Sequence, residues 1–516
     1  MGDNIGIRNV KLGALFSYLL IILNSAYALV ITPFVLGTLG EAEYGVYKTI
    51  ASLSSSLMVL DLGIGGTATR YIAKYKAEKK EKDIESFVSM IIGEAIIMIG
   101  VVIVLCCFLF FALPSVYKRG LDSTQIALAR KLFVILSINI LFHLIENVFY
   151  GILAGYNRFA FSNGTKLLRI LLRVVLIYVV LFFFKSSIAL VLIDLVLTIL
   201  LILVEYFYIR WSISIKLSVT IGNWDKAVFS ESFKYTGLMF LTSIAAQVNS
   251  NLDNVVIGSI LGATFVAIYS MALTIYAMFE NLSTAISGVM LPTITNSLNK
   301  DPTGGEAQRI VISAGRIQFM LLGAVYGGFI VLGKDFIHLW LGDGFEDVYP
   351  IAIILMTPSL LSLCINVCLS ILRAKKLLGF RTMVMTGVTI LNAIITIVGV
   401  KLSGYYAAAV GTCISVLLGS VILMCMYYQK KLNMNMWLVY KLILKKSWIC
   451  ILCSSLITFF CATYIRGTWI NLLIDIVVFL ITYSIFLLVF GFNKNEREQA
   501  KIVLKKIHIK EKRRDD

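Results

Sequence analysis

The chain has 516 residues, of which 59% are hydrophobic and 15% are charged, and its formal net charge is +17. A soluble domain carries about 25% charged residues, so this composition excludes a soluble protein and indicates a membrane protein. The positive charge is typical of topology signals and of contact with anionic membrane lipids, and we expect no nucleic-acid partner.

The apolar residues recur in windows of about 20 residues, the length that crosses a hydrocarbon core of ~30 Å. The sequence therefore predicts an all-α polytopic membrane protein with about fourteen transmembrane helices. We place these spans at residues 12–36, 45–69, 86–112, 126–153, 159–183, 187–209, 235–258, 263–294, 310–333, 349–372, 380–402, 405–428, 447–465 and 468–490.

Two short stretches at equivalent places in this series are similar to each other. FVLGTLGEAEYGVY at Phe34–Tyr47 and VIGSILGATFVAIY at Val256–Tyr269 are displaced by 222 residues, and each lies at a turn between two spans. Many membrane transporters are built from two repeated halves. We predict two pseudo-symmetric six-helix bundles at residues 1–215 and 216–430, two extra helices at 431–492, and a basic cytoplasmic tail at 493–516.

Lysine and arginine residues indicate the orientation of the spans. If the spans alternate across the membrane, 37 of the 46 lysines and arginines fall on the side that holds the N-terminus. Cytoplasmic segments carry such an excess. We therefore predict a multi-pass protein of the cell membrane with cytoplasmic N- and C-termini, in which both copies of the repeat lie at outside turns.

The sequence argues against an enzyme. The predicted outside loops are short and the three histidines are scattered. Cys450 and Cys453 have the spacing of metal ligands, but they lack a second pair and a nearby histidine, so we interpret them as packing residues. We expect no catalytic residue, no metal and no cofactor.

Ionisable residues inside the spans cost about 2.5–3.5 kcal/mol each on insertion scales, so they are expected to face a cavity or a partner. Lys48 lies near the outer end of the second span, and Arg130 and Lys131 lie within the outer turns of the fourth. Further in-span charges are Asp61, Glu94, Glu146, Arg169, Arg173, Asp194, Asp253, Glu280, Arg316 and Asp475.

Each of these charges has an alternative interpretation. Lys48 can extend to the outer interface and Arg316 to the cytoplasmic one. Glu146, Arg169 and Arg173 can pair between helices.

Uncharged polar residues gather in two spans that the repeat makes equivalent. Asn24 lies in the first span, and Asn249 and Asn251 lie shortly before Asp253 in the seventh. We expect these side chains to line facing walls of a cavity between the halves. Interhelical hydrogen bonds that serve packing are the alternative.

Several motifs resemble those of a known family. PFVLGTLGEAEYGVY at Pro33–Tyr47 and DLGIGGTATRYIAKY at Asp61–Tyr75 are similar to the N-terminal signature of polysaccharide-biosynthesis flippases in the multidrug/oligosaccharidyl-lipid/polysaccharide exporter superfamily. The second half continues the resemblance with DNVVIGSILGATFVAIYSMA at Asp253–Ala272, LWLGDGF at Leu339–Phe345, ILRAKKLLG at Ile371–Gly379 and GYYAAAVGT at Gly404–Thr412.

This resemblance implies a flippase that moves an undecaprenyl-diphosphate-linked oligosaccharide to the outer leaflet by alternating access, for assembly of cell-surface polysaccharide. It implies a monomer whose partners are this substrate and membrane lipids. Cations in the cavity offset desolvation of the diphosphate and polar groups replace water around the sugars. The substrate-binding candidates are therefore Lys48, Arg130, Lys131, Asn24, Asn249 and Asn251.

Three alternatives remain open at this point. A lipid II flippase is disfavoured, because such proteins carry arginines in the first and eighth spans, whereas here the first span is uncharged and Glu280 is the only charge of the eighth. A cation-coupled multidrug exporter of the same superfamily typically has twelve spans. A member that does not transport is the third.

Transport is expected to be driven by H⁺ or Na⁺, or else by the membrane potential or by removal of the product. A buried carboxylate can titrate or can bind a cation. The ion-coupling candidates are Asp61, Asp253 and Glu280. We expect the cavity between Pro33–Asp61 and Asp253–Glu280, with the repeat as its outer gate.

Overall fold

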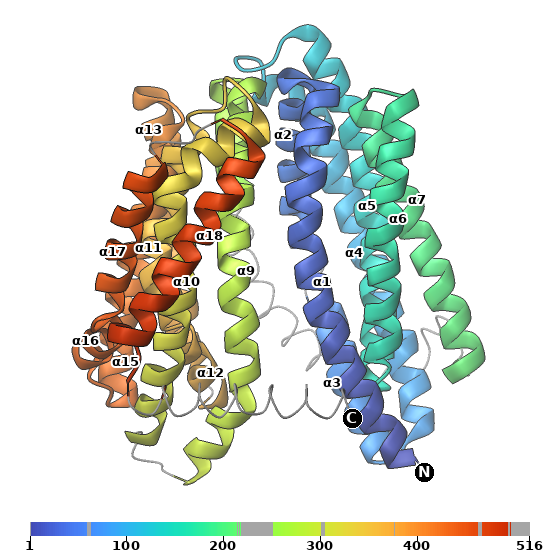
Figure 1. Cartoon of the computed structure of the whole chain (residues 1–516). Coiled ribbons are helices and arrows are strands. Elements are labelled where there is room, and N and C mark those ends of the chain that lie inside the picture. The colour runs from blue at the N-terminus through green and yellow to red at the C-terminus, as the bar shows by residue number, and fades with distance from the viewer. Residues whose placement is uncertain are drawn as a thin grey trace, which may run out of the picture. The chain divides into compact units, whose positions relative to one another are not determined.

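A computed structural model describes residues 2–58, 63–213, 251–300, 305–375, 377–462 and 467–493, with the single residues 215, 217 and 496 beyond those runs. The described chain is helical and contains no strand, which confirms an all-α protein. Its long helices are visible in Figure 1. Asp61, Asn249 and most of the predicted seventh span lie outside the described residues.

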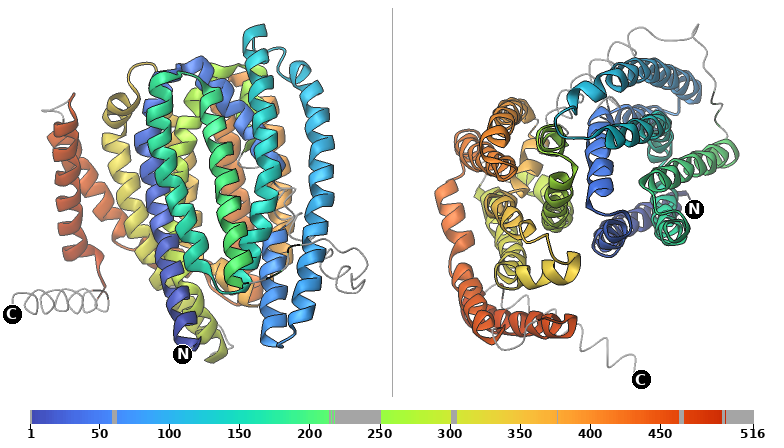
Figure 2. Two further views of the ribbon diagram at one scale, coloured as in Figure 1. Left: turned by 90° about the vertical axis from the view of Figure 1, so that its right-hand side faces the viewer. Right: turned by 90° about the horizontal axis from the view of Figure 1, so that it is seen from above.

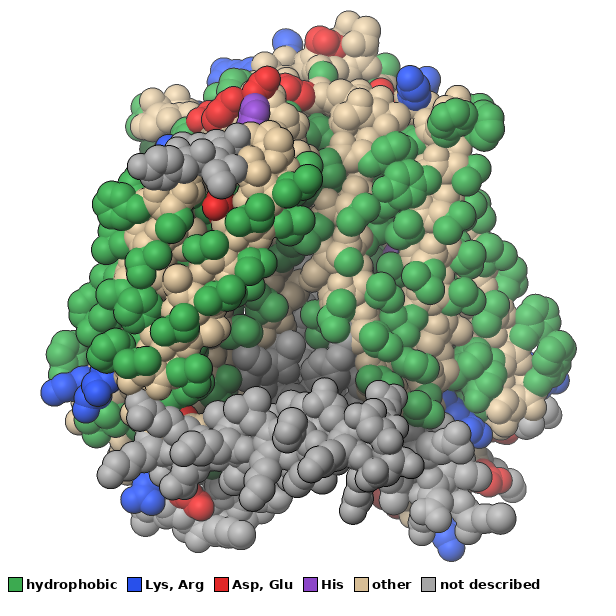
Figure 3. Space-filling view, in the orientation of Figure 1, with side chains coloured by type: hydrophobic (Ala, Val, Ile, Leu, Met, Phe, Trp, Pro, Cys, Tyr) green, Lys and Arg blue, Asp and Glu red, His purple; other side chains and the backbone are tan. Residues whose placement is uncertain are grey.

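Ten helical segments in the described ranges are long and apolar enough to cross a membrane, or eleven if the pair α11 (Val348–Cys364) and α12 (Val367–Ala374), bent by 52°, is one span. Such helices satisfy their backbone hydrogen bonds internally, which a bilayer requires. On the face seen in Figure 3, hydrophobic side chains cover the helices and charged ones gather towards their ends. The polytopic membrane fold is confirmed, while the count of fourteen stays a prediction.

The chain divides into two compact units, Met1–Thr274 with Met385–Thr412 and Ile275–Val384 with Cys413–Asp516. The division falls inside helices α9, α13 and α14, so each of them contributes to both units. The predicted boundary at residues 215 and 216 lies elsewhere, where the chain is not continuously described. The four predicted domains therefore remain a prediction.

The first unit is built around α5, which packs against α2, α3, α4 and α7, while α6 packs on α1. Its helices are α1 (Gly2–Leu39), α2 (Glu41–Leu57), α3 (Ile64–Ala77), α4 (Glu81–Val116), α5 (Ser123–Gly155), α6 (Phe159–Phe183), α7 (Ser187–Tyr208) with η2 (Ile209–Ile213), helical residues 251–260, and parts of α9 (Ala263–Lys300), α13 (Leu378–Ser403) and α14 (Tyr406–Val416).

The second unit is built around α10, which packs against α11, α16, α17 and α18. This unit contains α11, α12 and parts of α9, α13 and α14, whose bounds are given above. Its other helices are α10 (Gly305–Leu341), η4 (Leu417–Leu423), α15 (Met424–Leu432), α16 (Met436–Leu444), α17 (Ser447–Ala462), α18 (Trp469–Phe486) and η5 (Leu487–Gly491). Figure 2 shows these helices from two further directions.

The helix ends follow from local sequence. Asp122 precedes α5 and accepts a hydrogen bond from the backbone N–H of Gln125 at 2.7 Å, while the Gln125 side chain accepts one from the backbone N–H of Asp122 at 3.2 Å. This reciprocal pair satisfies backbone groups that a helix start leaves open. Hydrogen bonds from Thr124 and Gln125 also hold the pKa of Asp122 below its usual value.

The repeat has a physical basis in the fold. Its two identical glycines, Gly40 and Gly262, have φ of 77° and 110° and each separates two consecutive helices. Only glycine adopts such a conformation readily, since it has no Cβ. The identity between the copies therefore reflects the same tight turn between helices.

Candidate functional site

Charged and aromatic side chains from four helices meet inside the first unit. Arg173 on α6 and Asp194 on α7 form a two-pronged ion pair, with Nε–Oδ1 at 2.6 Å and a terminal nitrogen to Oδ2 at 2.7 Å. The Arg173 guanidinium also lies 4.8 Å from the ring centre of Tyr27 on α1. The alternative interpretation of Arg173 as an interhelical partner is thus confirmed.

Lys48 extends this group from α2. Its Nζ lies 5.4 Å from the ring centre of Tyr44, and it is close enough to Arg173 to interact with that charge. Tyr47 lies beside the same ion pair. The side chain of Lys48 remains partly exposed and, among the described residues, no carboxylate lies within ion-pair distance of it. We call Tyr27, Tyr44, Tyr47, Lys48, Arg173 and Asp194 the Lys48 cluster.

The Lys48 cluster carries two cations and one carboxylate, so one positive charge is left over. Arg173 and Asp194 neutralise each other, whereas Lys48 contacts the ring of Tyr44 and is paired with no carboxylate among the described residues. A lysine held against an aromatic ring can exchange this weak contact for an anionic ligand. The three tyrosines supply flat apolar faces together with hydroxyl groups.

A second polar group in the first unit surrounds Asp253, whose side chain is only 3% exposed. Tyr269 Oη donates a hydrogen bond to Asp253 Oδ2 at 2.6 Å. Thr396 Oγ1 donates to Oδ1 at 3.2 Å, and Thr412 Oγ1 donates to Oδ2 at 3.1 Å. Asn392 bonds to Thr412 and Thr396 in turn. In the described part of the chain no lysine or arginine pairs with this carboxylate.

Close packing of small residues joins α2 to the segment that carries Asp253. A Cβ added to Gly45 would meet the carbonyl oxygen of Ala263 at 1.9 Å, and one added to Gly258 would meet Thr49 at 2.7 Å. Nearer Asp253, Asn254 donates to Ser52 Oγ at 2.9 Å. At this level the two segments are in direct contact, so the cavity predicted between them does not extend here.

Glu280 lies in the second unit, on α9. Tyr276 Oη donates to Glu280 Oε1 at 2.9 Å and lies 2.9 Å from Ser359 Oγ. Within the described residues, no cation is paired with Glu280. It therefore shares with Asp253 the features of a carboxylate held by hydroxyl groups alone.

The other predicted site residues are more dispersed. Arg130 lies over the ring of Phe110 on α4, at 5.3 Å, and Lys131 is exposed. Asn24 is exposed and donates to the carbonyl of Leu20 in its own helix, while Asn251 is partly buried. None of the described contacts joins these four residues to Lys48.

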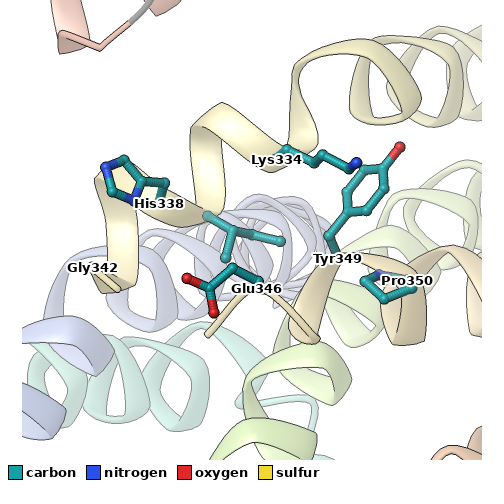
Figure 4. Close-up of a pocket in the computed structure, with 7 residues that line it drawn as sticks. Lys334, His338, Gly342, Glu346, Tyr349 and Pro350 are labelled. Carbon is teal, nitrogen blue, oxygen red and sulfur yellow. The ribbon is translucent and has the colours of Figure 1, made fainter. Parts of the chain in front are cut away.

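A pocket of about 380 Å³ lies in the second unit between the end of α10 and the start of α11. Figure 4 shows Lys334 reaching towards Tyr349, 5.5 Å from its ring centre, with Glu346 beneath. Backbone hydrogen bonds at Gly344 and Glu346 hold the pKa of Glu346 below its usual value. No predicted site residue lines this pocket.

Comparison with known proteins identifies the family. A family model described as polysaccharide biosynthesis protein matches residues 10–298, more than half of the chain. The chain belongs to this family. A putative O-antigen transporter of Salmonella typhi is 25% identical over 339 residues, covering 64% of this chain and 74% of the relative. An uncharacterised membrane protein of Methanocaldococcus jannaschii is 24% identical over 274 residues, or 52% and 62% of the two chains.

Two solved structures show a fold similar to that of this chain. The lipid II flippase MurJ in an inward closed conformation superposes with a TM-score of 0.72 at 18% identity, covering 92% of this chain and 98% of that chain. An inward-facing multidrug resistance MATE family transporter of the MOP superfamily gives a TM-score of 0.60 at 14% identity, with coverage of 79% and 98%. The family and fold predicted from the motifs are therefore confirmed.

Sequence reasoning missed several members of the polar group around Asp253. Asn392, Thr396 and Thr412 were not singled out, because uncharged polar residues are common in transmembrane helices and lie far from Asp253 in sequence. The partner of Arg316 was missed as well. Arg316 is 3% exposed and bonds to Glu496, with Nε–Oε1 at 2.6 Å, so its guanidinium is paired and shielded from solvent.

Proposed function

We propose that this chain is a flippase for an undecaprenyl-diphosphate-linked oligosaccharide, acting by alternating access in the assembly of a cell-surface polysaccharide. The observation that carries the proposal is Lys48, a cation without a carboxylate partner in the described residues. Its Nζ lies 5.4 Å from the ring centre of Tyr44, in the cluster that also contains Tyr27 and Tyr47. Membership of the polysaccharide biosynthesis family and likeness to a putative O-antigen transporter support it.

The chemistry of the Lys48 cluster fits such a cargo. A diphosphate carries charge that must leave water as the head group crosses, and an unpaired cation offsets that cost. Tyrosines offer apolar ring faces and hydroxyl groups to the sugars. Because Arg173 is already neutralised by Asp194, it positions the tyrosines while Lys48 binds the anion.

Asp253 is the ion-coupling site in this proposal. Its carboxylate is surrounded by the hydroxyls of Tyr269, Thr396 and Thr412, with Asn392 next to them. Oxygen ligands of this kind suit a hard cation such as Na⁺, and the carboxylate alone suits H⁺. The close contact of the Asp253 segment with α2 links its occupancy to the packing of the repeat.

The expected setting is a monomer in the cell membrane with both termini in the cytoplasm. The excess of lysine and arginine on one side of the predicted spans supports this orientation. A reporter that is active only outside the cytoplasm, fused to either terminus, tests this orientation. Activity of that reporter would contradict cytoplasmic termini.

Cargo selectivity in binding tests the proposed function. Purified protein is titrated with a fluorescent undecaprenyl-diphosphate oligosaccharide, with lipid II and with a cationic drug. We expect the oligosaccharide to bind most tightly and Lys48→Ala to weaken that binding. Preference for lipid II or for the drug would replace the proposal by a lipid II flippase or a multidrug exporter.

A further inference from the structure

An apolar groove of about 340 Å³ lies between α4 and α5 on the first unit. Ile103, Phe110, Phe133 and Leu141 are among its lining residues, and apart from Ser137 and two cysteines every lining side chain is hydrocarbon or an aromatic ring. Phe111 at its edge is 74% exposed, so the groove is open. The two helices stand side by side in Figure 2.

The groove lies along two membrane-spanning helices. Both α4 and α5 are long and apolar enough to cross a bilayer. A hollow in a lipid-facing surface loses dispersion contacts unless a chain of suitable shape fills it. The hydrocarbon surface of an acyl chain matches the apolar lining of this groove.

One end of the groove carries an unpaired cation. Arg130 lies in the second turn of α5, with its guanidinium 5.3 Å from the ring centre of Phe110, which lines the groove. In the described part of the chain its Nε is buried without a hydrogen-bond partner and no carboxylate pairs with the side chain. An arginine in this setting fits a phosphate group.

The surroundings of Arg130 favour an anionic head group. Three further basic residues are exposed at this end of the groove. Lys118 and Arg119 lie in the loop between α4 and α5, and Lys131 lies near the start of α5. The same loop contains one carboxylate, Asp122. Each basic residue near a membrane surface attracts anionic lipid. The excess of positive charge at this end complements a negatively charged lipid better than a neutral one.

We propose that the α4–α5 groove binds one anionic phospholipid, with its phosphate at Arg130 and an acyl chain along Phe110, Phe133 and Leu141. By the predicted topology this lipid belongs to the outer leaflet. The site is separate from the Lys48 cluster, and its occupancy does not depend on whether the chain moves an oligosaccharide.

Lipid retention measured by native mass spectrometry tests the site. The full chain is delipidated, then mixed with phosphatidylglycerol or phosphatidylcholine of identical acyl chains. We expect the chain to retain one molecule of phosphatidylglycerol in preference to phosphatidylcholine. Arg130→Gln should lower its retention about fivefold, the effect of one basic residue near a membrane surface. Lys185→Ala, which removes an exposed cation from the loop between α6 and α7, should leave retention unchanged.

A second variant tests the apolar part of the site. Val134 lines the groove and is 44% exposed, so Val134→Phe fills the space without changing charge. We expect it to lower phosphatidylglycerol retention, whereas Val175→Phe, at an exposed position of α6, should not.

Equal retention of the two lipids by the native chain would overturn the proposal, as would unchanged retention in a folded Arg130→Gln or Val134→Phe variant. If Arg130→Gln does not fold, Val134→Phe and the comparison of the two lipids decide. Displacement of phosphatidylglycerol by undecaprenyl phosphate at equal concentration would assign the groove to the prenyl carrier and would also overturn it.

Discussion

Lys48 is the residue whose charge the proposed cargo needs, because the neighbouring Arg173 is already paired with Asp194. We expect Lys48→Ala to weaken binding of the diphosphate-linked cargo about tenfold to a hundredfold, since a hydrogen bond to a charged group contributes roughly 1.5–3 kcal/mol. Lys48→Arg keeps the charge and should retain most of the affinity. Titration of fluorescent cargo measures both, with the exposed Lys185→Ala as control.

An unchanged affinity in Lys48→Ala would contradict this role. It would return Lys48 to the alternative interpretation from the sequence, in which the side chain extends to the outer interface.

Substitution of Asp253 tests the coupling of transport to an ion gradient, again at the scale of a single residue. Asp253→Asn keeps the size of a side chain that accepts hydrogen bonds from Tyr269, Thr396 and Thr412 but removes its charge. We expect a Na⁺ or a proton gradient to accelerate transport by the native chain in vesicles, and neither gradient to accelerate the variant. Acceleration that persists in Asp253→Asn excludes Asp253 as the coupling site, and its loss in Glu280→Gln instead would assign coupling to Glu280.

At the scale of helices, the contact between α2 and residues 251–263 depends on glycine. A Cβ at Gly45 would lie 1.9 Å from the Ala263 carbonyl oxygen, so Gly45→Ala forces the segments apart. We expect Gly45→Ala to open this packing and to expose a cysteine placed at Thr49, which is buried in the native chain. Labelling of Thr49→Cys by an impermeant maleimide measures the opening.

Gly37→Ala is the matched control, because nothing lies within 4 Å of a Cβ at Gly37. Equal labelling in the two glycine variants would show that this contact does not control access.

Arg316 holds several elements of the second unit together. From α10 it donates to Glu496 and to the carbonyl oxygens of Leu442 and Gly491, at 2.9 and 2.8 Å for the two carbonyls. Breaking a buried ion pair by removing one partner costs about 3–5 kcal/mol, because the other group stays uncompensated. We therefore expect Arg316→Ala to lower the free energy of unfolding by about this amount and to expose α16–α18 to protease.

Arg309→Ala provides the comparison, since Arg309 is an exposed arginine on the same helix. Thermal unfolding followed by tryptophan fluorescence measures both variants. Similar midpoints for Arg316→Ala and the native chain would contradict a stabilising role for the Arg316 contacts.

For the molecule as a whole, the sequence predicted what depends on local pattern. Apolar windows predicted the helical membrane fold. The repeat predicted the turns at Gly40 and Gly262, because a positive φ favours glycine and so can be recognised in the sequence. The pairing of Arg316 with Glu496 joins residues 180 positions apart, and no periodicity reports such a contact. The same holds for Thr396 and Thr412 around Asp253.

Tertiary packing also decided which predicted residues gather. Lys48 lies with Arg173 and Tyr27, whereas Arg130 lies over a ring of α4, although both were predicted from the same in-span charge pattern. Sequence position decides which face of a helix a residue lies on. Which element packs against that face depends on the tertiary structure, and a single sequence does not identify it.

Transport of a labelled cargo across vesicles tests the central claim most directly. Vesicles that contain the purified chain and a fluorescent undecaprenyl-diphosphate oligosaccharide are treated with an impermeant reagent that destroys the fluorophore. We predict that the native chain and Lys185→Ala make the inner-leaflet cargo accessible to the reagent, and that Lys48→Ala does so far more slowly. Protection of the inner-leaflet cargo equal to that in protein-free vesicles would contradict a flippase for this substrate.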